Sequence, residues 1–542
     1  MAAQRPDQVA VAETAGRDRT GQRRYRQFTF RELDDDSGRI AAGLENLGVR
    51  PGTRLALLVR PGIDFVSLVF ALFKTGAVVV LIDPGMGRKN LIRCLADAEP
   101  EGFVAIPIVH AVRTLLRRRF PHSRFHVTVG RRWFWGGPTL AHLRRTDRTR
   151  PAVARGADDP AAIIFTTGST GPPKGVLFSH GNFDAQVEEI RDFFNIRPGE
   201  VDVPCFPLFG LFNCAMGVTA VIPCMDPTRP AKVDPREIVA AAADWNATQA
   251  FGSPAVWNRV GHYCAGEIKL PSVRRVLSSG APVSADVLAR MKAAIHPEGD
   301  MHTPYGATEA LPVASIAASE VLGETAARTR EGAGVCVGRR FPRIQWKVIR
   351  IVDGPIPTLA EAQPLPEGEI GELIVRGPVV TRRYVTRVEA NATGKIADGQ
   401  DVWHRMGDVG YLDPQDRFWF CGRLAHRVLT ADGPMYTIPC ETIFNNHPRV
   451  FRSALVGVGP AGRQRPVIVV EPRAGMIPRT PADRAALIAE LRELAHTRTH
   501  TAAIEAFLVH PSFPVDIRHN AKIFREKLAV WAAERCSGRA KE

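Results

Sequence analysis

The chain has 542 residues, more than one hydrophobic core normally holds, so we expect more than one domain. Hydrophobic residues make up 45% of the chain and aromatic residues 7%, which favours a soluble globular protein over a disordered one. Lys and Arg outnumber Asp and Glu by 71 to 56, a formal net charge of +15 that could favour nucleic acid, anionic lipid or anionic substrates. Because the cations are dispersed, we expect a generally basic surface and no nucleic-acid partner.

The densest group of cations lies beside apolar side chains. It could contact a membrane or a partner protein, but we expect a solvated helix end. The cations are Arg117, Arg118, Arg119, Arg124, Arg131 and Arg132, flanked by Leu115, Leu116, Phe120, Trp133 and Trp135.

Nine cysteines are scattered along the chain, and none forms a Cys-x-x-Cys pair. This pattern favours reduced thiols over a disulfide framework or a zinc site, so we expect a cytoplasmic protein. The N-terminus lacks the apolar segment of a signal peptide. The most apolar run, residues 65–82, is interrupted by Lys74 and Gly76, which favours a buried helix and strand over a transmembrane helix.

Helix and strand patterns alternate over the first 160 residues. Helical spacing occurs at residues 39–44, 65–73 and 91–96, and strand-like apolar runs lie at residues 55–59, 77–82 and 103–106. Such alternation predicts a parallel sheet covered by helices on both faces, and hence an α/β fold.

A strand-like run enters a loop of glycine and hydroxyl residues within residues 163–176. Backbone N–H groups in such a loop can form a nest for an anion, and glycines permit close approach. Hydroxyl groups add donors and Lys174 adds a mobile cation, so the loop predicts a polyphosphate cradle. The candidate nucleotide-binding residues are Thr166, Thr167, Gly168, Ser169, Thr170, Gly171 and Lys174.

The loop is not a Walker A motif, because Lys174-Gly175-Val176 replaces the required Gly-Lys-Ser/Thr. A surface turn between two strands is the alternative interpretation. The stretch resembles the phosphate-binding signature of the adenylate-forming superfamily, which includes acyl-CoA synthetases, fatty-acyl-AMP ligases, luciferases and peptide-synthetase adenylation domains. The resemblance implies a large N-terminal region of parallel-rich sheets covered by helices, and a small, mobile C-terminal α+β domain.

A phenylalanine-rich segment, residues 206–212, resembles the family's Pro-Leu-Phe-His pattern beside the acyl pocket, but Gly210 replaces the histidine. The resemblance implies substrate contacts from Phe209, Gly210, Phe251 and Gly252. Core packing is an equally good interpretation of the aromatic cluster, because large apolar side chains are usually buried.

Glycine-rich strand ends in α/β folds are common nucleotide sites. Gly280, Ala281 and Pro282 follow a strand-like run at residues 273–277. In the family the matching segment lies beside the adenine.

A second motif at residues 305–309 reads Tyr-Gly-Ala-Thr-Glu. Tyr305 offers a flat face for a base, Thr308 a hydroxyl for a phosphate, and Glu309 a hard oxygen ligand for Mg²⁺. The alternative is a turn followed by a helix with Glu309 in its first turn. The resemblance implies that Tyr305, Gly306 and Thr308 bind the nucleotide, and that Glu309 and Thr167 hold the metal.

A third motif, residues 404–411, contains Asp408. An acidic side chain at a strand end can accept both ribose hydroxyls, although a surface turn is the alternative. The family match makes Asp408 the ribose ligand and Arg423, at the end of the next strand, a donor to the ribose or phosphate.

The resemblance divides the chain into a large ATP- and acyl-binding domain, residues 1–423, and a small mobile domain, residues 424–542. Ala425 stands where the family usually has Asp or Lys at the hinge, and residues 430–434 depart from the Lys-x-x-Gly form that faces CoA. Both departures weaken the case for a CoA step. Lys522 matches the family's late lysine and would contact the carboxylate and α-phosphate. An exposed lysine on a C-terminal helix is the alternative.

Within the superfamily the chain most closely resembles the β-lactone synthetases of the bacterial long-chain olefin pathway. The resemblance rests on residues 222–223, 225–230, 303–314, 404–411 and 420–423. Such enzymes convert a 2-alkyl-3-hydroxy fatty acid and ATP into a β-lactone, AMP and pyrophosphate, without CoA. The implied cofactors are ATP and Mg²⁺, and the implied catalytic residues are Lys522, Glu309 and Thr167. A multi-enzyme assembly with other pathway enzymes is also implied.

Two other functions stay open at this point. The first is an acyl-CoA synthetase or fatty-acyl-AMP ligase of the same fold. The second is a non-catalytic acyl- or nucleotide-binding protein on a degenerate scaffold.

Overall fold

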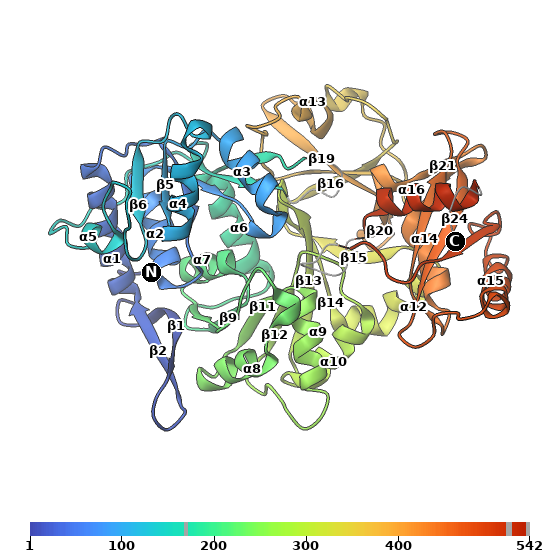
Figure 1. Cartoon of the computed structure of the whole chain (residues 1–542), viewed down its shortest axis with the longest axis horizontal. Helices are drawn as coiled ribbons and strands as arrows, with labels where there is room; N and C mark the ends of the chain where they lie inside the picture. Colours follow the sequence, from blue (N-terminus) through green and yellow to red (C-terminus); the bar gives the residue numbers. More distant parts are fainter. Residues whose placement is uncertain (167–171, 516–522, 538–542) are drawn as a thin grey trace.

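The computed structural model describes residues 1–166, 172–515 and 523–537. These residues form a six-stranded sheet, a larger 14-stranded sheet and a smaller C-terminal region, with helices packed around them (Figure 1). Within the described ranges, no helix combines the length and apolarity needed to cross a bilayer. All nine cysteines are free thiols.

The six-stranded sheet has the order β6-β5-β3-β4-β7-β8 and is parallel except for β8, which runs antiparallel to β7. It confirms the α/β alternation predicted for the first 160 residues. Its strands are β3 (Arg54–Leu58), β4 (Val78–Leu81), β5 (Gly102–Ala105), β6 (Phe125–Thr128), β7 (Pro160–Phe165) and β8 (Gly175–Ser179). The helices around it are α1 (Phe30–Asn46), α2 (Ile63–Thr75), α3 (Arg88–Asp97), α4 (Pro107–Leu115), α5 (Leu140–Leu143) and α6 (His180–Phe193), with 3-10 turns η1 (Pro84–Met86) and η2 (Arg117–Arg119).

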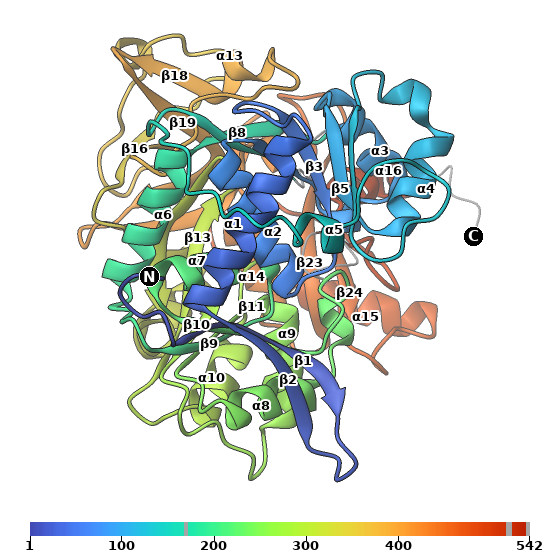
Figure 2. The same ribbon diagram turned by 90° about the vertical axis from the view of Figure 1, so that its left-hand side faces the viewer.

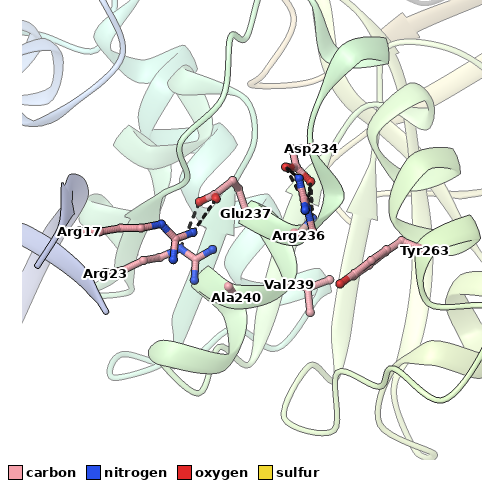
Figure 3. Close-up of a pocket in the computed structure, with 8 residues that line it drawn as sticks. All are labelled: Arg17, Arg23, Asp234, Arg236, Glu237, Val239, Ala240 and Tyr263. Atoms are coloured by element: carbon pink, nitrogen blue, oxygen red, sulfur yellow. Dashed lines mark hydrogen bonds and ion pairs between the residues drawn. The ribbon is translucent and has the colours of Figure 1, made fainter. Parts of the chain in front are cut away.

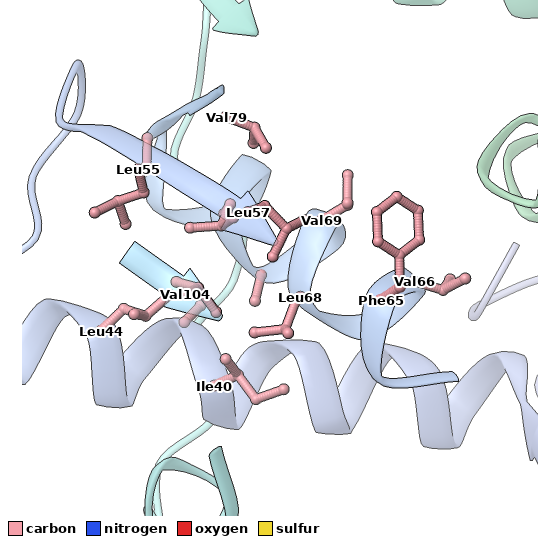
Figure 4. Close-up of a cluster of buried hydrophobic side chains, with 14 of the residues drawn as sticks. Ile40, Leu44, Leu55, Leu57, Phe65, Val66, Leu68, Val69, Val79 and Val104 are labelled. Atoms are coloured by element: carbon pink, nitrogen blue, oxygen red, sulfur yellow. The ribbon is translucent and has the colours of Figure 1, made fainter. Parts of the chain in front are cut away.

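The core of this region forms between α1, α2 and the sheet (Figure 4). A capping box starts α1: the Thr29 hydroxyl accepts from the Glu32 N–H, and the Glu32 carboxylate accepts from the Thr29 N–H. Ile40 and Leu44 on its apolar face then pack with Leu57 of β3 and their neighbours. This packing holds β7, from which the phosphate loop leaves.

The large sheet is parallel in its first half and antiparallel in its second. Strands β1, β10, β9, β11, β12 and β13 are parallel, with β2 antiparallel at one edge. They are β1 (Val9–Arg17), β2 (Arg23–Thr29), β9 (Val201–Pro204), β10 (Thr219–Ile222), β11 (Gln249–Gly252), β12 (Arg275–Ser278) and β13 (Asp300–Ala307). The helices that follow these strands are α7 (Pro207–Met216), α8 (Pro235–Asp244), α9 (Pro254–Tyr263) and α10 (Ala285–Ala294), with a 3-10 turn at η3 (Pro230–Lys232).

Beyond β13 every strand pairing in the large sheet is antiparallel. Some of the connections are short, such as the two residues between β13 and β14, which leave no room for a crossover helix. The strands are β14 (Ala310–Ala317), β15 (Val335–Arg340), β16 (Gln345–Ile349), β17 (Gly371–Arg376), β18 (Lys395–Asp398), β19 (Asp401–Leu412) and β20 (Arg417–Arg423). Short helical segments here are α11 (Ala318–Glu320), η4 (Val321–Thr325), α12 (Ala326–Arg330), η5 (Leu359–Glu361) and α13 (Ala390–Gly394).

The C-terminal region follows a single 3-10 turn, η6 (Leu424–His426), directly after β20. It has its own three-stranded sheet and its own apolar clusters, one of which includes Phe444, Leu455 and Leu487. Its elements are β21 (Val428–Thr430), β22 (Gly433–Met435), α14 (Thr437–Asn445), β23 (Val450–Val458), β24 (Arg465–Pro472), α15 (Pro481–Ala495), β25 (Ala506–Val509) and α16 (Arg525–Cys536).

Candidate active site

The neck of the phosphate loop is closed by two hydrogen bonds. The Thr166 N–H donates to the Lys174 carbonyl at 3.0 Å, and the Lys174 N–H donates to the Thr166 hydroxyl at 3.1 Å. Thr166 is therefore a structural acceptor at the base of the loop. The predicted nucleotide contacts Thr167, Gly168, Ser169, Thr170 and Gly171 lie outside the described residues.

Residues 380–386 connect the phosphate loop to the turn that carries Glu309. At one end the Gly175 N–H donates to the Thr386 hydroxyl at 2.7 Å, and Val176 forms a β-bridge with Tyr384. At the other end the Thr381 N–H donates to the Glu309 carbonyl at 2.9 Å. The segment thus joins the small sheet to the large one and fixes the two motifs relative to each other.

Glu309 is buried, and its carboxylate accepts a hydrogen bond of 2.7 Å from the Tyr384 hydroxyl. Burial, followed by the charge of Glu309, raises the pKa of Tyr384, so this hydroxyl remains a donor. The Lys174 ammonium lies 4.6 Å from the Tyr384 ring centroid, and that of Lys395 lies 5.7 Å from it. One aromatic ring therefore places two cations beside the predicted metal ligand.

Lys395 and His404 also belong to this cluster, although no role was predicted for either of them. The Lys395 ammonium donates to the Thr381 carbonyl. Burial lowers the pKa of Lys395 to about 7, with a smaller contribution from the charge of Lys174. The His404 Nδ1–H donates to the Gly394 carbonyl at 2.9 Å, and burial beside Lys395 holds the pKa of His404 well below its usual range. His404 is thus a neutral neighbour of the cations.

Tyr305, Asp408 and Arg423 form a second cluster. The Tyr305 hydroxyl donates to one carboxylate oxygen of Asp408, and Arg423 donates to the other at 2.6 Å. Burial and the charge of Asp408 raise the pKa of Tyr305 well above its usual value. Arg423 also interacts electrostatically with Glu309, so the two clusters share one electrostatic environment.

The structure excludes the alternative interpretation of residues 305–309, and it corrects the expected strand end at Asp408. Residues 305–309 are not a turn that starts a helix, because Tyr305 lies in β13 and Thr308 and Glu309 form the two-residue turn into β14. A side chain at Gly306 would place its Cβ 2.6 Å from the Ala310 carbonyl oxygen, which explains the glycine. Asp408 does not end a strand but lies inside β19, opposite Arg423 of β20.

The residues expected at the acyl pocket come together on α7 and β11. The rings of Phe209 and Phe251 stack at 4.0 Å with an interplanar angle of 11°. Phe209 is buried in the same apolar cluster against which Tyr305 packs. Gly210 lies in α7, and Gly252, which ends β11, faces the Trp257 ring. Both the pocket and the core interpretation of these aromatic residues fit this placement.

The loop of Gly280, Ala281 and Pro282 follows β12, between the ends of β11 and β13 in the sheet order. Gly280 and Pro282 are exposed. In a parallel sheet the carboxyl ends of strands share an edge, so this loop and Tyr305 lie at the same edge. Lys522, the predicted contact of the carboxylate and the α-phosphate, lies outside the described residues.

A separate surface pocket of about 400 Å³ lies between the β1–β2 hairpin and α8 (Figure 3). Its charges are paired with one another. Glu237 accepts from Arg17 and Arg23 at 3.0 and 3.1 Å, and Asp234 pairs with Arg236 at 2.7 Å. Because these pairs compensate each other, the pocket lacks the convergent cations found around Glu309.

Comparisons with known proteins show the family to which the chain belongs. The model of the AMP-binding enzyme family matches residues 1–385. The olefin beta-lactone synthetase of Xanthomonas campestris pv. campestris is 47% identical over 98% of this chain and 96% of its own length. The olefin beta-lactone synthetase of Stenotrophomonas maltophilia is 46% identical over 100% of this chain and 98% of its own length.

Solved structures share the fold at lower identity. ATP-bound MatB from Rhodopseudomonas palustris has a TM-score of 0.77 at 22% identity, over 97% of this chain and 96% of that chain. The amide bond synthetase McbA from Marinactinospora thermotolerans has a TM-score of 0.77 at 22% identity, over 97% of each chain. The family model and the two close relatives agree on one assignment, and the chain therefore belongs to the AMP-binding enzymes as an AMP-forming ligase.

Proposed function

We propose that this ligase activates a long-chain 2-alkyl-3-hydroxy fatty acid with ATP and closes it to a β-lactone. The observation that carries the proposal is the identity of 47% and 46%, over nearly the full chain, to two proteins named olefin beta-lactone synthetase. Ala425 and residues 430–434, where this chain departs from the CoA-ligating pattern, support a reaction that needs no CoA.

The reaction has two steps. A carboxylate oxygen of the acid bonds to the α-phosphorus of ATP, and pyrophosphate leaves. The 3-hydroxyl oxygen then bonds to the acyl carbon, AMP leaves, and the hydroxyl proton passes to solvent. Because both nucleophiles belong to the substrate, the protein contributes position and charge neutralisation.

The described residues fit a protein that positions the substrates and neutralises their charge. Lys174, Lys395 and Arg423 bring positive charge to one buried cluster, where it favours phosphate oxygens more than it would in water. Asp408, held by Tyr305 and Arg423, is proposed to accept the ribose hydroxyls. Lys522 is proposed as the cation between carboxylate and α-phosphate. Arg525, three positions later in the chain, is anchored to Glu441 of α14 at 2.6 Å.

Glu309 fits a role in holding Mg²⁺. Its Oε1 accepts from Tyr384, and within the described residues no hydrogen bond reaches its Oε2. Among the described residues, no three His, Cys, Asp or Glu side chains come together in a group that could hold a metal ion. Glu309 and Thr167 would therefore hold the ion together with phosphate oxygens. When bound, Mg²⁺ neutralises phosphate charge.

The test is mass spectrometry of the products from ATP, Mg²⁺ and a racemic 2-alkyl-3-hydroxy acid, with no CoA. We expect a product lighter than the acid by one water, together with equal amounts of AMP and pyrophosphate. The matched substrate without the 3-hydroxyl should give no lactone. A strict requirement for CoA with a thioester product would assign the alternative, acyl-CoA synthesis. No consumption of ATP with any acid would assign a binding protein.

The proposal also includes the compartment in which the enzyme acts and the proteins with which it assembles. We expect the enzyme to act in the cytoplasm, within an assembly that includes the enzymes that supply the hydroxy acid and consume the lactone. The free state of its cysteines is consistent with a reducing compartment. Co-purification of pathway enzymes with the tagged chain is the corresponding measurement.

A further inference from the structure

Helix α4 presents an apolar face to solvent. Ile108, Val112 and Leu115 are 56%, 42% and 81% exposed, and their spacing of four and three residues places them on one side of the helix. The opposite side, with His110 and Arg113, is buried. Figure 2 shows α4 at the periphery of the molecule, so its outward face is not covered by another element in that view.

A loop beside α4 adds two exposed aromatic residues, Trp133 at 51% and Phe134 at 71%. The loop is held in place by Trp135, which is buried, stacks on His110 of α4 at 5.4 Å and donates to the Thr128 hydroxyl at 2.9 Å. Trp133 and Phe134 lie against Trp135 with ring centroids 5.4 and 5.1 Å away. The anchor therefore keeps the two exposed rings beside the helix.

The charge around these residues is predominantly positive, although Glu99 and Arg119 line one small pocket and Glu101 pairs with Arg124 at 2.7 Å. Residues 102–146 contain no Asp or Glu, and they carry nine arginines: Arg113, Arg117, Arg118, Arg119, Arg124, Arg131, Arg132, Arg144 and Arg145. Arg117, Arg118 and Arg119 follow α4 directly in η2 and are exposed, as are Arg131 and Arg132 in the aromatic loop. Within the described part of the chain, none of these five forms an ion pair.

We infer that the α4 patch, defined as Ile108, Val112, Leu115, Trp133 and Phe134 with the five exposed arginines around them, docks the protein on an anionic lipid bilayer. Aliphatic and aromatic side chains of this kind enter the boundary between headgroups and acyl chains. Arginines beside them pair with lipid phosphates, and their excess over the neighbouring Glu99 and Glu101 favours an anionic surface. The inference goes beyond the proposed function and does not depend on it.

A protein partner is the competing occupant and is less well supported. Aromatic residues and arginine are also common at interfaces between proteins, but the five exposed arginines without an ion pair give this patch an excess of positive charge that matches an anionic bilayer. The expected solvated helix end is present, because Arg117, Arg118 and Arg119 are exposed, and the structure adds that the flanking Leu115 and Trp133 are exposed while Trp135 is buried.

The experiment is co-sedimentation of the full chain with vesicles of phosphatidylcholine alone and of phosphatidylcholine with 30% phosphatidylglycerol, at about 0.05 and 0.5 M salt. We expect binding to the anionic vesicles, at least tenfold weaker binding at the higher salt, and little binding to the neutral vesicles. Leu115→Asp combined with Phe134→Asp should weaken binding at least tenfold.

A matched control adds the same charge at an unrelated surface. Phe451→Asp combined with Ile477→Asp changes two residues of the C-terminal region that are 51% and 45% exposed, and it should bind vesicles as the wild type does. Circular dichroism melting of both double variants checks that they fold. The inference is overturned if the wild type does not bind anionic vesicles, or if both double variants lose binding equally. It is also overturned if the patch variant changes only the molecular mass in solution, which would assign the patch to a second copy of the chain.

Discussion

Glu309 is a buried carboxyl group whose nearest neighbours are a phenol hydroxyl and, across the same ring, two ammonium groups. No sequence motif marks Tyr384 or Lys395, because their contacts join residues far apart in the chain. Glu309 and Tyr384, for example, are separated by 75 positions. The motif residues could be singled out in the sequence by their own chemistry. The residues that position them, Tyr384 and Lys395, could be identified only from the folded structure.

We predict that Tyr384→Phe lowers the rate of ATP–pyrophosphate exchange about ten- to a hundredfold. A hydrogen bond to a charged group contributes about 1.5–3 kcal/mol, and its loss leaves Glu309 less well oriented. The apparent affinity for Mg²⁺ should fall together with the rate, which a purely structural role would not produce. The matched control is Tyr411→Phe, which removes a hydroxyl that donates to the Ala333 carbonyl at 3.0 Å outside the site. Equal effects of both changes would contradict the prediction.

Lys395 makes the stability of the protein depend on pH. Its pKa is lowered by burial to about 7 in the folded state, so between that value and its unfolded pKa near 10.4 the unfolded chain binds more protons. Stability therefore rises with pH across this window, and the penalty for a buried ammonium is fully present below pH 7.

We predict that the free energy of unfolding gains about 2 kcal/mol from Lys395 between pH 7 and pH 9. The Lys395→Met variant should lack this gain, so the difference between the two proteins shrinks or reverses as the pH rises. Urea denaturation at both pH values measures it. Identical pH profiles would show that Lys395 does not carry the shift.

Residues 380–386 matter as an element because they pair with both β8 and the start of β14. The alternating pattern of the first 160 residues predicted helices and parallel strands correctly, since those contacts are local and repetitive. The antiparallel half of the large sheet was not predicted, because its strands pair across irregular loops whose lengths carry no periodic signal.

Asp408 was expected at the end of a strand, but it lies inside β19. Gly407 adopts a φ of 64°, and the pairing of β19 with its neighbours shifts register around it. In sequence a glycine before an aspartate is typical of a turn, but here it forms an irregularity inside a 12-residue strand. The distortion aims Asp408 at Tyr305 without ending the sheet.

The hydroxyl of Thr386 supports the phosphate loop, so we predict that Thr386→Val destabilises the protein by about 1–3 kcal/mol. Valine keeps the shape but leaves the buried Gly175 N–H without its acceptor. The affinity for ATP should fall as well. Thr386→Ser retains the acceptor and is the matched control. Chemical denaturation and ATP titration measure the two effects, and a serine variant as impaired as the valine variant would refute this role.

At the scale of the whole molecule, the C-terminal region is attached to the rest mainly through β20, η6 and α14. Contacts between the two parts include the pair Arg427–Asp353 and a bond of 2.8 Å from the Asn446 amide to the Arg330 carbonyl. Such exposed polar contacts contribute little free energy. We therefore keep the proposal that residues 424–542 rotate relative to residues 1–423 during the reaction.

Gly422, near the end of β20, lies against the start of α14. It has a φ of 139°, and a Cβ there would overlap the Thr437 hydroxyl of α14. We predict that Gly422→Ala increases hydrogen exchange in α14, because overpacking of this kind costs about 1–3 kcal/mol. Gly433→Ala, at a φ of 123° with open space around it, is the control for backbone strain alone. Adding Thr437→Ala should restore protection, and a lack of rescue would contradict the proposed clash.

The segment at residues 380–386 and the stacked pair Phe209–Phe251 are held by different interactions, which has a consequence for protein engineering. The nucleotide side is braced by strand pairing and by Thr386, whereas the expected acyl side depends on two rings from α7 and β11. Chimeras that exchange α7 and β11 with those of a relative should therefore change chain-length selectivity while they leave the affinity for ATP intact.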